Sequence, residues 1–68
     1  MSNFNSWLVT LDRVAKEQGI SRYDQLLLDA AEVQLILGNL GAASELVFKM
    51  NNYQVVKIFQ NLKQVEEY

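Results

Sequence analysis

The fold of this chain is decided by residues 46–65, which read LVFKMNNYQVVKIFQNLKQV. Apolar residues recur there at helical spacing in two stripes that differ by roughly 130° in azimuth, at about 100° per residue. The first stripe holds Leu46, Val47, Met50 and Tyr53, and the second holds Val55, Ile58, Phe59, Leu62 and Val65. The stripe changes sides at Asn51 and Asn52. Because asparagine is a mediocre helix former and a good N-cap, we expect a break there; a bend in one continuous helix is the alternative.

The length and the composition predict a small single domain, residues 1–68, that associates with itself. A chain of 68 residues, half of them hydrophobic, has little interior in which to bury apolar side chains. Folds of this size usually add disulfides, a metal or a second subunit. Cysteine and histidine are both absent, which removes disulfides, thiolate sites and the commonest zinc ligand. We therefore expect a homo-oligomer, most simply a dimer.

The charge balance is that of an ordinary soluble protein. Six Lys and Arg oppose eight Asp and Glu, and the net charge of −2 comes from Glu66 and Glu67. No basic field marks a binder of the phosphate backbone, so nucleic acid is not an expected partner. No uninterrupted apolar run exceeds three residues, and no secretory signal is recognisable. We expect no membrane contact and a cytoplasmic location.

Periodicity and end signals predict an all-α fold of three to four helices around one leucine-rich core. Phe4, Trp7 and Leu11 begin the stripe of the first helix, and Gly19 followed by Ile20 ends it. Ser21 to Asp24 reads as a capping box that opens the second helix, with Asp in place of the usual Glu. The expected helices span residues 3–18, 22–37, 42–50 and 53–66.

The second helix is unusual because its apolar residues cover more than half of its circumference. Only Gln25, Asp29 and Glu32 form a polar sector. A helix of this kind is either central in a fold or part of an interface. For the dimer interface itself, the expected residues are those of the second stripe: Val55, Ile58, Phe59, Leu62 and Val65.

Catalysis is not expected. Two carboxylate pairs, Asp29 with Glu32 and Asp12 with Glu17, are the only candidates for acid–base chemistry, and both are expected on solvated polar sectors. The hydroxyl side chains have no histidine to activate them. No Gly-rich phosphate loop and no calcium-type loop is present, so we expect no enzyme, cofactor, metal or small-molecule substrate.

A partial resemblance to a DNA-reading helix-turn-helix lies in residues 14–22, VAKEQGISR. The resemblance implies DNA contacts by Lys16, Arg22 and Tyr23. It departs from the motif at Gln25, where an apolar residue should pack the second helix inward, and two acids would face phosphates. A small DNA-binding regulator is therefore the alternative function, and a helix end followed by a capping box is the structural alternative.

Taken whole, the chain resembles the small helical early proteins encoded in the exo–xis region of lambdoid phages. Residues 3–8 (NFNSWL), 11–13 (LDR) and 15–22 (AKEQGISR) carry the resemblance, together with the Leu/Ala-rich middle. The resemblance implies a non-enzymatic accessory factor in the host cytoplasm. Such a factor influences the choice between lysis and lysogeny, or host physiology, through contacts with host or phage proteins. The function expected from the sequence is accordingly a protein-interaction or regulatory module.

Overall fold

The computed structural model describes residues 4–66, and within this range the fold is all-α, with no strand. The four helices are α1 (Asn5–Gln18), α2 (Arg22–Ile36), α3 (Leu40–Val47) and α4 (Tyr53–Glu66). The all-α prediction is thus confirmed, and three of the four helices begin and end within two residues of the expected positions. The third helix begins two residues earlier and ends three residues earlier than expected. It ends early because N–H groups of Lys49 and Met50 bond to carbonyls three residues back and close the chain into a turn.

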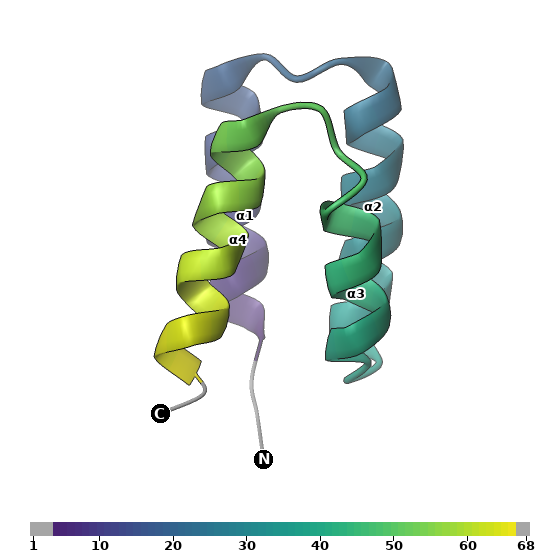
Figure 1. Cartoon of the computed structure of the whole chain (residues 1–68), viewed down its shortest axis with the longest axis vertical. Helices are drawn as coiled ribbons and strands as arrows, with labels where there is room; N and C mark the ends of the chain where they lie inside the picture. The colour runs from purple at the N-terminus through teal and green to yellow at the C-terminus, as the bar shows by residue number, and fades with distance from the viewer. Residues whose placement is uncertain (1–3, 67–68) are drawn as a thin grey trace.

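The four helices run up and down the long axis of the molecule as two antiparallel pairs (Figure 1). In one pair α1 lies beside α4, and in the other α2 lies beside α3. The α1–α2 and α3–α4 connections both cross at the upper end of the view. The first and last helices of the described chain are therefore packing partners.

The helix ends follow the signals in the sequence. Gly19 adopts the left-handed conformation at φ +64°, and its N–H bonds to the carbonyl of Ala15. Gly38, at φ +82°, ends α2 in the same way: its N–H bonds to Leu35, and that of Asn39 bonds to Gln34. This pair of hydrogen bonds is a Schellman motif.

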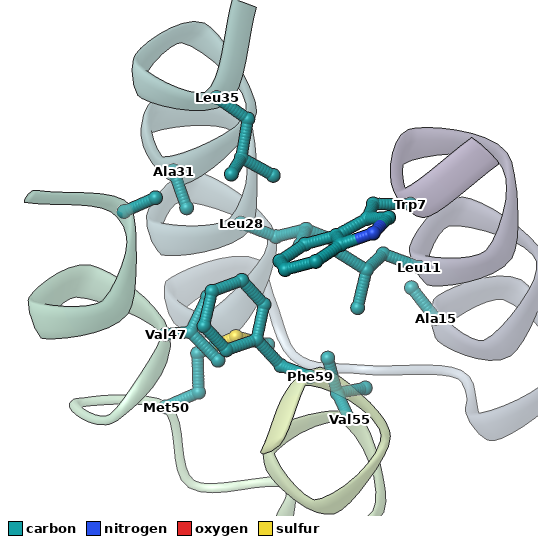
Figure 2. Packing of buried hydrophobic residues seen from close by; sticks show 11 residues of the cluster. Trp7, Leu11, Ala15, Leu28, Ala31, Leu35, Val47, Met50, Val55 and Phe59 are labelled. Atoms are coloured by element: carbon teal, nitrogen blue, oxygen red, sulfur yellow. The ribbon is translucent and has the colours of Figure 1, made fainter. Parts of the chain in front are cut away.

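The core gathers buried side chains from all four helices (Figure 2). At its centre the Trp7 ring of α1 meets the Phe59 ring of α4 edge-on, with centroids 5.6 Å apart. The other buried apolar residues are Leu11, Ala15, Leu28, Ala31, Leu35, Ala43, Val47, Met50 and Val55. This cluster is the single leucine-rich core that the periodicity predicts.

The chain breaks at Asn51 and Asn52 rather than bending there. The two residues lie between α3 and α4, and the side-chain oxygen of Asn52 accepts the N–H of Val55 at the start of α4. Asn52 is thus the N-cap that asparagine favours. The chain reverses direction at this point, so α4 has an axis of its own (Figure 1).

This reversal corrects the expectation that the second stripe faces another chain. Val55 and Phe59 have no exposed surface, and Ile58 and Leu62 are half-buried against the core. A difference in azimuth has meaning only along one continuous helix. Once the turn redirects α4, the rotated stripe faces the same interior as Val47 and Met50.

Candidate interaction surface

The largest set of exposed apolar side chains lies on α2, on the side away from the core. Its opposite side carries the residues that anchor the helix: Asp24, Leu28, Ala31 and Leu35 are all buried. On the exposed side, apolar residues recur from Tyr23 to Leu37 at steps of three, four, three and four positions. Ile36 lies beside Leu37. We call this set the outer face of α2: Tyr23, Leu26, Ala30, Val33, Ile36 and Leu37.

The outer face is highly accessible along its whole length. Leu26 and Val33, near its middle, are 58% and 52% exposed, and Ile36 at its C-terminal end is 70% exposed. Tyr23 and Leu37, at the two ends, are 54% and 65% exposed. Four large side chains of α2 and that of its C-cap residue, Leu37, leave roughly 600 Å² of accessible surface, which is the upper end of what a typical monomer exposes in one patch.

The α2 sequence produces this surface because its polar sector is narrow. Gln25 and Asp29 occupy that sector and bond to each other, with the amide nitrogen of Gln25 donating to Asp29 at 2.8 Å. Beyond the first turn, the remaining circumference is apolar except for Gln34, and one domain of this size covers only the part that faces α3 and α1. Of the two alternatives that the sequence leaves for α2, a central position or a place at an interface, the open side favours the second.

The residues expected at the dimer interface are divided by the fold. Val55 and Phe59 belong to the core and are not available to another chain. Ile58 and Leu62 are half-buried, and Val65, at 68%, is the exposed member of the set. The expectation that this stripe of α4 is an open docking face is therefore corrected, because most of its area is already covered by α1 and the core.

The three residues of the DNA-binding alternative are exposed around the α1–α2 connection. Lys16 lies in the last turn of α1, and Arg22 and Tyr23 lie in the first turn of α2. Asp24 does not face outward as the motif would place it, because it is 2% exposed. Tyr23 also belongs to the outer face of α2, where its neighbour one turn on is Leu26.

One carboxylate pair differs from the expectation of a solvated sector. Asp12, Glu17 and Asp29 are exposed, but Glu32 is half-buried, and its Oε2 atom has no hydrogen-bond partner among the described residues. Burial raises the pKa of Glu32 to about 8, helped by hydrogen bonding to Asp12 and by the negative charges of Asp12 and Asp29. At neutral pH the Glu32 carboxyl is therefore mainly in its neutral, protonated form.

A shallow cavity of about 390 Å³ lies elsewhere, beside α4. Gln60, Lys63 and Gln64 of α4 line it together with Phe48, which follows α3. The Lys63 ammonium stands 5.8 Å from the centre of the Phe48 ring, a cation–π contact. Glu32 does not line this cavity, so the protonated carboxyl and the hollow do not form one site.

The residue that the sequence pattern misassigned is Asp24. Its N–H bonds to the Ser21 side chain, as the capping box predicts, but its carboxylate does not return to the Ser21 backbone. Instead the two carboxylate oxygens accept the N–H groups of Asn51 and Asn52, at 2.8 and 2.9 Å. A signal for this role is present in the sequence, because Asp24 stands in line with Leu28, Ala31 and Leu35 on the core stripe.

Neither the described residues nor a comparison with known proteins points to a ligand or a relative. Within residues 4–66, no helix is long and apolar enough to cross a membrane. No group of three acidic, histidine or cysteine side chains in the described range is placed to hold a metal ion. Compared with known proteins, the chain matches no family model, no curated protein and no solved structure. The outer face of α2 is therefore the feature of the described chain that bears most directly on function.

Proposed function

We propose that this chain is a non-enzymatic protein-interaction module that binds its partners through the outer face of α2. The observation that carries the proposal is the contiguous exposed stripe from Tyr23 to Leu37 on a helix whose opposite side is fixed in the core. Large apolar side chains left in water each forgo about 1.5–3 kcal/mol of burial free energy. A patch of this extent on a small protein is typical of an interaction site.

The chemistry of the face favours a helical or flat apolar partner. Its exposed large side chains carry no charge, and its single polar group is the Tyr23 hydroxyl. Helices that dock on one another use apolar residues at steps of three and four positions, which is the spacing found here. The homodimer expected from the composition is part of this proposal. Its interface lies on α2 and not on α4.

The regulatory role and the phage context are part of the same proposal. The resemblance to exo–xis early proteins supports an accessory factor that acts in the host cytoplasm by contacting host or phage proteins. Such a role needs a stable small scaffold and one binding face, and it needs no catalytic site.

The proposal is tested by comparing two valine variants on different helices. Val33 on the outer face is 52% exposed, and Val9 on α1 is 69% exposed, so a lysine at either position leaves the core intact. Tagged wild type, Val33→Lys and Val9→Lys are used as baits in a bacterial lysate that also contains an untagged copy. We expect Val33→Lys to lose the proteins that wild type and Val9→Lys retain. Identical capture by all three baits would reject the outer face as the binding surface.

DNA binding is the alternative, supported by the exposure of Lys16, Arg22 and Tyr23. Binding through phosphate contacts weakens steeply with salt. Titration of a labelled duplex at low and at physiological salt distinguishes the two functions. Tight, salt-dependent binding that is lost in Arg22→Ala would favour the alternative, whereas binding at background level at low salt would reject it.

A further inference from the structure

We infer that the outer face of α2 pairs with the outer face of α2 in a second copy of this chain. The inference rests on the proposed function and names the partner of the same surface. It starts from the register of the exposed residues: Tyr23, Leu26, Ala30, Val33 and Leu37 follow the alternating steps of a two-stranded helical seam. The buried residues Leu28 and Leu35 fall on the opposite side, where a paired helix contacts the rest of its own domain.

The area of the face matches what a small dimer needs. Specific interfaces bury about 1,200–2,000 Å² in total, so each partner contributes at least about 600 Å². The large side chains of the outer face leave roughly that area exposed in one chain. A symmetric dimer uses the same patch twice, so one face on each copy is sufficient.

The borders of the face do not oppose self-association. Arg22 and Asp29 lie along one border, one of each sign, and both are exposed. Leu27 and Gln34, both half-buried, lie along the other border and carry no charge. A second copy therefore meets no block of like charge. Ala30, near the middle, presents only a methyl group, which lets two helix axes approach closely.

The rest of the fold leaves this approach open. α2 and α3 form one side of the molecule in Figure 1, and α1 and α4 form the other. The ends of the described chain are at the α1–α4 side, away from the helix that would pair. The large side chains of the outer face are exposed from Tyr23 to Leu37, so a helix of equal length can lie along it.

Sedimentation equilibrium on the full chain tests the inference at about 100 µM, where a dimer with a micromolar dissociation constant is almost fully formed. We expect a dimer for wild type, a dimer for Val9→Lys, and at least half of the chains as monomer for Val33→Lys, with the dissociation constant raised about 100-fold or more. Circular dichroism of the three proteins verifies that each one is folded. A monomeric wild type overturns the inference, and so does equal dissociation of the two lysine variants.

Cross-linking provides a second measurement that does not weaken the face. The chain has no cysteine, so Val33→Cys and Val9→Cys each carry one thiol. We expect a short bis-maleimide to join two copies of Val33→Cys and not of Val9→Cys. A monomeric wild type whose Val33→Lys variant still loses another captured protein would overturn self-pairing alone. No difference between the valine positions in any of these assays would overturn the proposed function as well.

Discussion

The carboxylate of Asp24 accepts the backbone N–H of Asn51 at 2.8 Å, although the two residues are 27 positions apart in the chain. The second oxygen of the same carboxylate accepts the N–H of Asn52. Both amides belong to the turn between α3 and α4, and Asp24 belongs to the first turn of α2. One buried side chain therefore satisfies two turn amides and fixes the α3–α4 connection to α2.

Replacing Asp24 should destabilise the fold more than any other single polar change. In Asp24→Asn the carboxylate becomes an amide, whose NH₂ group cannot accept from Asn51 or Asn52. Loss of a charge-assisted hydrogen bond in a buried site costs about 2–4 kcal/mol in the free energy of unfolding. Urea denaturation measures this cost. The control is Asp29→Asn, which is exposed on the same helix and should change the value by less than about 0.5 kcal/mol.

Truncation of Phe59 should act on the core. Its ring is fully buried and meets both Trp7 and Phe48 edge-on. Phe59→Ala leaves a cavity and should lower the free energy of unfolding by about 3–5 kcal/mol. Thermal unfolding followed by Trp7 fluorescence measures the loss. Val65→Ala on the same helix, at a position 68% exposed, should unfold at nearly the wild-type temperature.

Glu32 should make the stability depend on pH. Its pKa is about 8 in the folded chain, compared with an ordinary value of 4.5, so the folded state holds the proton more tightly than the unfolded state. Its stabilising contribution is complete below pH 4.5, decreases as the pH rises from 4.5 to 8, and is absent above 8. Allowing for solvent screening, the change is about 1–2 kcal/mol.

Glu32→Gln tests this behaviour because glutamine resembles the protonated acid and does not titrate. The variant should be more stable than wild type at pH 9 and close to wild type at pH 4, with a flatter profile in between. Urea denaturation at several pH values measures both profiles. Glu45→Gln, at an exposed position on α3, should keep the wild-type slope; a wild-type slope in Glu32→Gln would contradict the assignment.

Alanine substitution at two glycines, three residues apart, should change the free energy of unfolding in opposite directions. Gly38 has φ +82°, a conformation that costs other residues about 1–2 kcal/mol, so Gly38→Ala should destabilise the chain by about that amount. Gly41 lies inside α3, and a Cβ built there meets no atom within 4 Å. Gly41→Ala should stabilise the chain by about 0.4–1 kcal/mol. Differential scanning calorimetry of the two variants measures both signs.

Local signals predict the helices well because they act over a few residues. Gly19, Ser21 and Asn52 each perform the end role that their residue type favours. The side on which α4 packs was not predictable in the same way, since it depends on the axis that α4 takes after the turn. The partner of Asp24 was also beyond local reasoning, because its amide donors come from a turn 27 positions away.

The candidate surface follows from composition only in part. The apolar excess of α2 is visible in the sequence, and it predicts that this helix is either enclosed or used at an interface. The choice between the two depends on how many neighbours α2 has. With α3 and α1 as its neighbours, α2 keeps one side open, and this count is a property of the tertiary fold.

The pairing of α1 with α4 has a consequence for synthesis on the ribosome. α1 is translated before the other three helices, yet the side chain that meets Trp7 across the core, Phe59, is supplied by the helix translated after them. Until α4 has left the exit tunnel, the indole lacks the Phe59 ring that packs against it edge-on. The complete core can therefore form only after α4 has emerged from the ribosome, and the nascent α1 is the segment that a chaperone would bind in the meantime.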